Sequence, residues 1–110
     1  MRRQLLLTLA LLLPCLASVS AAEVGAVFEN NCAACHGLDG SANTPQGRKL
    51  KAKDLRASTL TDADIERQIR EGSKTKSGST VMPAFGRDLT DAQIQEAIRT
   101  VKSFRLPAPK

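Results

Sequence analysis

The sequence predicts a small all-α domain. Apolar residues recur three and four positions apart in three segments, around residues 23–34, 61–71 and 91–104, and this spacing is typical of amphipathic helices. No run of alternating or β-branched residues, which would indicate a strand, comes just before Cys32 and Cys35. A chain of 110 residues is long enough for one domain at most. These observations together favour a single helical unit.

The first 22 residues have the layout of a cleavable signal peptide. Two arginines are followed by an apolar stretch over residues 5–13 and by small residues at 20–22. Pro14 and two serines interrupt the apolar character, so a retained membrane anchor is the less favoured alternative. Cleavage leaves residues 23–110 as one domain exported to the periplasm. This mature chain of 88 residues carries 14 basic and 11 acidic side chains, a mildly basic net charge of +3.

The first and last predicted helices are expected to cross. In the first helix, Val24, Val27 and Phe28 form one apolar face, and Gly25 lies on the side of Phe28, where a glycine lets another helix approach closely. The expected partner is the last helix, whose apolar stripe is formed by Ile94, Ala97, Ile98 and Val101. The two chain ends of the domain are therefore predicted to pack together.

Capping residues define the ends of the other helical segments. Thr61 is the predicted N-cap of the middle helix, and Gly72 suits the position just after its last turn. Thr90 and Gln93 form the pattern of a capping box at the start of the last helix. Both helices are thus predicted to begin with a threonine N-cap, and the similarity is too short to indicate a domain repeat.

The strongest chemical signal is the stretch Cys32-Ala33-Ala34-Cys35-His36. Two thiols three positions apart with an imidazole directly after them are the attachment signature of a c-type haem. On a helix both thiols face the same way, so each can form a thioether to one edge of the haem while His36 reaches the iron. Because the chain has only three aromatic residues, a large apolar cofactor would also complete a thin core. One covalent haem c is the predicted cofactor.

Other uses of two such cysteines are a disulfide, a redox dithiol or half of a zinc site. A redox dithiol is expected after a strand, which the sequence does not indicate here. A tetrahedral zinc site needs four ligands, and the mature chain offers only Cys32, Cys35 and His36 from the cysteine and histidine classes. Haem attachment is therefore favoured.

A basic segment follows, with five positive charges in the nine residues from 48 to 56. Three roles compete for it: a solvated surface, pairing with haem propionates, for which Arg48 and Lys49 are the candidates, or attraction of an acidic redox partner. Nucleic-acid binding is disfavoured, because the domain is exported and no aromatics interleave with the charges. Upstream, the backbone around Pro45 is the candidate carbonyl acceptor for the second ring nitrogen of His36.

Met82 is the candidate for the second axial position. The mature chain has one histidine and one methionine, so the ligand opposite His36 is Met82, a lysine, or none. Pro83 favours an extended backbone at Met82 and stiffens a loop that lies between two capped helices. Met82 is the preferred choice among the three.

Several of these residues together resemble the class I mono-haem c-type cytochromes over residues 23–105. The shared features are Gly25, Phe28, Cys32, Cys35, His36, the loop Met82-Pro83-Ala84-Phe85 and the terminal helix. The resemblance implies a small helical bundle around the haem, crossed terminal helices, His36 and Met82 as axial ligands, and a proline carbonyl acceptor that maps to Pro45. The family's aromatic residue on the last helix corresponds to Ile98 or Val101 here, and its Trp or Tyr at a propionate is missing.

The predicted function is that of a periplasmic single-electron carrier and not of an enzyme, because two filled axial positions leave the iron no vacant site. The expected partners are redox proteins, acidic docking surfaces among them, with membrane contact only through partner complexes and a monomeric chain. The alternatives are a haem enzyme or gas sensor with a labile Met82, since the Ser-, Gly- and Lys-rich residues 73–80 look mobile, and a dithiol oxidoreductase without haem.

Overall fold

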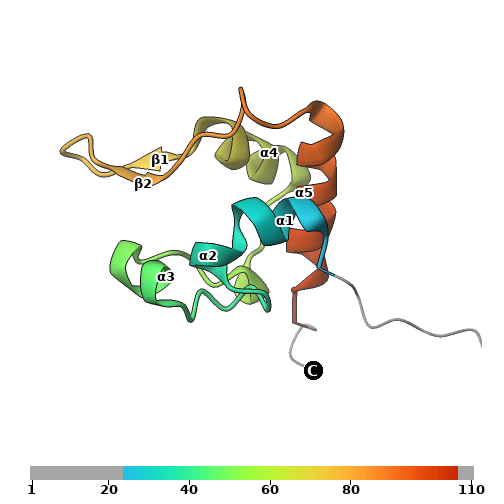
Figure 1. Cartoon of the computed structure of the whole chain (residues 1–110), viewed down its shortest axis with the longest axis horizontal. Coiled ribbons are helices and arrows are strands. Elements are labelled where there is room, and N and C mark those ends of the chain that lie inside the picture. The colour runs from blue at the N-terminus through green and yellow to red at the C-terminus, as the bar shows by residue number, and fades with distance from the viewer. Residues whose placement is uncertain (1–23, 107–110) are drawn as a thin grey trace, which may run out of the picture.

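The computed structural model describes residues 24–106, so the predicted signal peptide and the last four residues lie outside the described part of the chain. The elements in order are α1 (Ala26–Asn31), α2 (Ala33–His36), α3 (Pro45–Leu50), the 3₁₀ turn η1 (Leu55–Ala57), α4 (Asp62–Glu71), β1 (Ser73–Lys74), β2 (Thr80–Met82) and α5 (Asp91–Ser103). The helical prediction is confirmed, with one short hairpin added (Figure 1). Within the described residues, no helix is both long and apolar enough to cross a bilayer.

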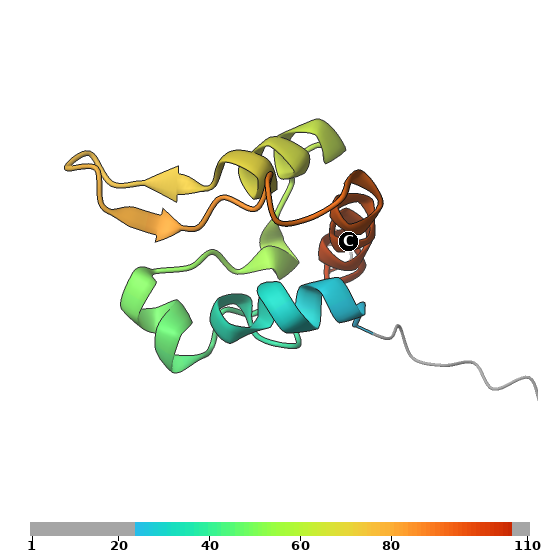
Figure 2. The same cartoon turned by 45° about the horizontal axis from the view of Figure 1, so that its top comes forward.

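Helices α1 and α5 pack against each other as expected (Figures 1 and 2). Gly25 lies at their closest approach, because a Cβ atom there would be 2.7 Å from Glu96 Oε1 and 2.8 Å from Thr100 Oγ1. Further along, the rings of Phe28 and Phe104 stack at a tilt of 59°, with their centroids 5.0 Å apart. The aromatic residue of the last helix is therefore Phe104 at its end, and not a residue at position 98 or 101.

The hydrophobic core lies between α1, α4 and α5. Its buried residues are Val27, Phe28, Ile65, Ile69, Leu89, Ile94, Ala97, Ile98 and Val101. Cys32 and Met82 are partly buried and pack against this cluster. The core and the cysteine segment are therefore one continuous packing unit.

The first predicted helix is interrupted at Cys32. This residue is both the C-cap of α1 and the N-cap of α2, and its φ of −121° departs from helical values. Hydrogen bonds continue across the break: Cys32 N donates to Phe28 O at 2.8 Å, and His36 N donates to Cys32 O at 2.9 Å. The second cysteine and the histidine are thus carried on a separate short turn.

Helix α3 lies outside the three segments that were predicted to be helical. The Thr44 side chain caps it by accepting from Gly47 N, and Pro45 occupies its first turn. The Thr44 hydroxyl also donates to Cys35 O at 2.9 Å. Gly47 is needed for this contact, because a Cβ atom there would overlap the Cys35 carbonyl oxygen. Helix α3 therefore packs tightly against α2 at the Cys35 carbonyl.

The caps predicted for the two longer helices are confirmed. The Thr61 side chain accepts from Asp64 N at the start of α4, and Gly72 ends that helix with φ +66°. At the start of α5, Thr90 and Gln93 form the complete capping box. The ends of both helices are thus fixed by local sequence.

The segment between α4 and the Met82 loop forms an antiparallel hairpin that projects from the helices (Figures 1 and 2). Ser73 pairs with Met82 and Lys74 with Thr80. Its turn is closed by a hydrogen bond of 2.9 Å from Thr75 N to Ser79 O. The stretch predicted to be mobile thus contains a hairpin, and its second strand ends at Met82.

Candidate functional site

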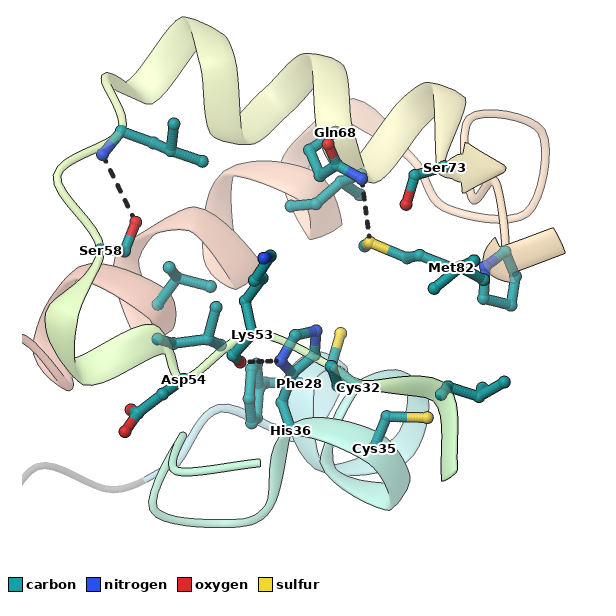
Figure 3. A pocket seen from close by; sticks show the side chains of 18 of the residues that line it. Phe28, Cys32, Cys35, His36, Lys53, Asp54, Ser58, Gln68, Ser73 and Met82 are labelled. Carbon is teal, nitrogen blue, oxygen red and sulfur yellow. Dashed lines mark hydrogen bonds between the residues drawn. The ribbon is translucent and has the colours of Figure 1, made fainter. Parts of the chain in front are cut away.

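A cavity of about 710 Å³ lies between the α1–α2 side and the α4–hairpin side of the domain. Cys32, Cys35 and His36 face it from one side, and Gln68 and Met82 face it from the opposite side (Figure 3). The volume is within the range of about 300–1,000 Å³ that is typical of cofactor and ligand pockets. Two thiols and an imidazole on one wall and a thioether on the other form a donor set that fits a covalently attached haem.

The His36 ring is oriented by the loop that follows α3. Its Nδ1 atom lies 3.0 Å from the backbone oxygen of Lys53, to which the ring N–H donates. This contact leaves Nε2 as the nitrogen that a metal could reach. Burial lowers the pKa of His36, and the Lys53 hydrogen bond opposes that shift.

The prediction that Pro45 supplies this carbonyl is corrected by the structure. Pro45 stands in the first turn of α3, and the acceptor comes from Lys53 beyond the end of that helix. Both residues belong to the chain after the cysteine motif, but only the later one turns its carbonyl toward His36. The α3 helix, which the sequence analysis missed, is what shifts the chain past Pro45.

Cys32 and Cys35 are both half-buried and form no disulfide with each other. Burial and the neighbouring Cys35 raise the pKa of Cys32 to about 11. Reactive redox dithiols have lowered pKa values instead, so the site does not match that alternative. The described residues contain no group of three His, Cys, Asp or Glu side chains able to hold a metal ion.

Met82 is held by its neighbours on both sides. Gln68 Nε2 donates to its sulfur at 3.4 Å. Beyond it, Phe85 N donates to Ile69 O at 2.9 Å, which ties the loop to α4. Gly72 allows the close approach, since a Cβ atom there would overlap the Met82 carbonyl oxygen. The end of α4 thus positions the loop that presents the sulfur.

Gln68 was not found by sequence analysis. It follows Ile65 by three positions and precedes Ile69, so it borders the buried face of α4. A polar side chain at the edge of an apolar face was the available signal. Its contact with Met82 shows that the amide belongs to the site.

The pairing of Arg48 and Lys49 with haem propionates stays a prediction. Arg48 donates to Asn43 Oδ1 at 2.7 Å, and neither Arg48 nor Lys49 lines the main cavity. Lys51 and Lys53 of the same segment do line it. The structure therefore moves the candidate positive charges toward the end of the segment.

Comparisons with known proteins agree with this geometry. Residues 19–99 match the family described as cytochrome C oxidase, cbb3-type, subunit III. Cytochrome c6 of Pyropia tenera is 37% identical over 78 residues, which cover 70% of this chain and 84% of that protein. Cytochrome c6 of Pyropia yezoensis is also 37% identical over 78 residues, but the match covers only 64% of its length. The solved structure of the KustC0563 c-type cytochrome superposes with a TM-score of 0.61 at 27% identity, covering 73% of this chain and 94% of that one.

Proposed function

The chain belongs to the cytochrome c family matched over residues 19–99, and we propose that this small mono-haem class I c-type cytochrome is a periplasmic single-electron carrier with His36 and Met82 as axial ligands. The protein carries covalently bound haem c and transfers electrons with redox partner proteins; it is not an enzyme. The observation that carries the axial assignment is the position of Met82 across the cavity from His36 (Figure 3).

Each residue of the site has a distinct task. When bound, the haem supplies an iron that changes its charge by one electron. Cys32 and Cys35 anchor the ring, and His36 is held in one tautomer by the Lys53 carbonyl. Met82 presents a sulfur, a ligand that favours the reduced iron and therefore a high potential.

Two filled axial positions explain why the function is electron transfer. Oxygen, peroxide or another small ligand needs an open position at the iron, and with haem bound the Met82 sulfur would close that position. The hydrogen bonds that join residues 85 and 86 to α4 keep the Met82 loop in place. His36 and Met82 would thus hold the iron from both sides through both oxidation states, with no bond to a substrate.

The location in the periplasm rests on the sequence of residues 1–22. Their charged start, apolar centre and small residues before position 23 are those of a cleavable export signal. Haem attachment after export is consistent with the use of the two cysteines. The mature chain acts as a monomer that reaches membranes through its partner complexes.

An absorption spectrum of the purified holoprotein tests the axial assignment. The oxidised protein is expected to show the weak far-red band of a thioether bound to ferric haem, and Met82→Ala is expected to lose it while retaining covalent haem. The reduced variant should then bind carbon monoxide. A high-spin spectrum of the unchanged protein would instead indicate a haem enzyme or sensor, and haem staining after denaturing electrophoresis verifies the thioethers.

A further inference from the structure

The carbonyl group that orients His36 belongs to a residue whose own backbone is not rigid. Lys53 O lies 3.0 Å from His36 Nδ1 (Figure 3), and Lys53 is exposed and belongs to no helix or strand. Lysine leaves both backbone angles free, whereas a proline would fix φ. A hydrogen bond to an axial ligand acts on the iron only if its acceptor stays in place. Other contacts must therefore hold this carbonyl.

Two backbone hydrogen bonds hold the chain on either side of Lys53. Before it, Ala52 N donates to Gly47 O in α3 at 2.8 Å. After it, Leu55 N donates to Gly40 O at 2.8 Å, in the loop that follows α2. Both glycines are buried. We call these two bonds the Lys53 clamp, because they fix the chain one residue before and two residues after that carbonyl.

The second bond of the Lys53 clamp depends on a close contact between Gly40 and the end of the last helix. Gly40 has φ +75°, and a Cβ atom there would lie 2.7 Å from Cδ2 and 2.8 Å from Cγ of Phe104, just beyond α5. The Phe104 ring is not free to turn away, because it also packs against Phe28 in the core. On its other side, the loop is joined to His36 by a hydrogen bond of 2.8 Å from Ala42 N to the His36 carbonyl. Gly40 thus links the clamp to the hydrophobic core and to His36.

We propose that Gly40 is a positioning residue for the axial ligand His36. By holding Leu55 in place, it keeps the Lys53 carbonyl within hydrogen-bond distance of His36 Nδ1. The inference rests on the proposed ligation of the haem iron by His36. An acceptor at Nδ1 makes the imidazole a stronger electron donor, which stabilises the oxidised iron and lowers the reduction potential. A loosened clamp should therefore raise the potential without removing either axial ligand.

The first pair of variants compares Gly40 with a second glycine that also contacts the last helix. Gly40→Ala places a methyl group against Phe104, in a backbone conformation that favours glycine. Gly25→Ala is the matched control, because its methyl group would also meet side chains of α5, at 2.7 and 2.8 Å, but takes no part in the Lys53 clamp. Both substitutions should lower the thermal midpoint, so a general loss of stability is common to the two variants.

The second pair decides the question if Gly40→Ala does not fold. Leu55→Pro removes the N–H that donates to Gly40 O. The substitution lies at the first position of η1, where proline suits the extended backbone of the preceding Asp54, whose ψ is 111°. Leu55→Val is the control, because valine also shortens the side chain but keeps the N–H. A difference within this pair therefore reports on the missing hydrogen bond.

All variants are prepared as mature holoprotein, and the exchange of the His36 Nδ1 proton with solvent is measured by NMR in the reduced, diamagnetic state. Gly40→Ala and Leu55→Pro should speed this exchange by at least about 10-fold, and the two controls by less than about 2-fold. In the same two variants, a redox titration should show the equilibrium between oxidised and reduced protein moved toward the reduced form by about 2- to 10-fold.

Exchange as slow in Leu55→Pro as in Leu55→Val would overturn the positioning role, and so would equal exchange in Gly40→Ala and Gly25→Ala. Absorption spectra of the same samples distinguish this failure from a failure of the proposed function. An intact Met–haem spectrum with unchanged exchange overturns the role of Gly40 alone, whereas a protein without haem, or with no histidine bound to the iron, overturns the proposed function with it.

Discussion

Replacing Gly72 by alanine is expected to detach Met82 from the iron while leaving the haem in place. Gly72 has φ +66° and ψ −161°, a backbone conformation that is essentially restricted to glycine and costs other residues about 1–3 kcal/mol. Its Cβ atom would also meet the Met82 carbonyl oxygen, the Pro83 carbonyl carbon at 2.8 Å and Ala84 N at 2.9 Å. These are backbone atoms, so they can give way only if the whole Met82 segment moves.

The loss of stability expected for Gly72→Ala can be compared with that expected for the same substitution at Gly78. Gly78 also has a positive φ, +90°, but a Cβ atom there would have no neighbour within 4 Å. Gly78→Ala therefore introduces backbone strain of about 1 kcal/mol without the overlap. A loss of ~2 kcal/mol lowers the midpoint of thermal unfolding by about 8–16 °C in a domain of this size, so Gly72→Ala is expected to be clearly the less stable variant.

The assay is the far-red band of the oxidised holoprotein together with carbon monoxide binding after reduction. Gly72→Ala should lose much of the band and bind carbon monoxide after reduction. Gly78→Ala should keep the band and should not bind carbon monoxide. If the two variants have the same spectrum and the same midpoint, the end of α4 does not position Met82, and the role given to Gly72 is wrong.

Three further variants probe other contacts of the site. Gln68→Leu removes the donor to the Met82 sulfur and should lower the reduction potential, measured by voltammetry, by up to about 20–60 mV. This figure follows because a hydrogen bond contributes ~0.5–1.5 kcal/mol and moving one charge through 100 mV corresponds to ~2.3 kcal/mol. An unchanged potential would show that the contact is lost when the sulfur binds iron. Gly47→Ala should destabilise the protein by about 1–3 kcal/mol in urea unfolding, because its methyl group overlaps the Cys35 carbonyl, and a neutral result would contradict the tight α2–α3 contact. The hydroxyl of the α4 N-cap holds the pKa of Asp64 below its usual range, so its stabilisation is present above the unfolded-state pKa and is lost as pH falls through the folded-state pKa. Asp64→Asn should therefore lower the thermal midpoint at neutral pH and have no effect in strong acid, and a pH-independent difference would exclude the carboxylate as the cause.

Local sequence predicted those parts of the fold whose cause is local. Thr61, Thr90 and Gly72 determine helix ends through their own side chains or backbone freedom, and all three were recognised. The approach of α1 and α5 was also predictable, because Gly25 leaves room for a second helix, although the α5 residues that it faces are Glu96 and Thr100 and not the apolar stripe. Patterns of this kind need no knowledge of distant contacts.

The errors arose where a distant contact decides the structure. Helix α3 is stabilised by the bond from Thr44 to the Cys35 carbonyl, although the pair Thr44-Pro45 was a usable start signal. Because this helix intervenes, the carbonyl that reaches His36 is that of Lys53 and not that of Pro45. The hairpin was also missed, since its strands of two and three residues are too short to show an alternating pattern.

The uneven placement of charge has an effect before any contact is made. With six positive side chains in residues 48–53 and 74–76, at the α3–hairpin end, and an excess of negative ones over the rest of the described chain, the molecule has a permanent electric dipole that points toward the mouth of the haem cavity. In the field of an anionic partner such a molecule rotates as it diffuses, and more of its collisions occur with the haem side forward. Dissolved salt weakens this alignment beyond about 10 Å at 0.1 M, so productive collisions become rarer even where the final complex is unchanged.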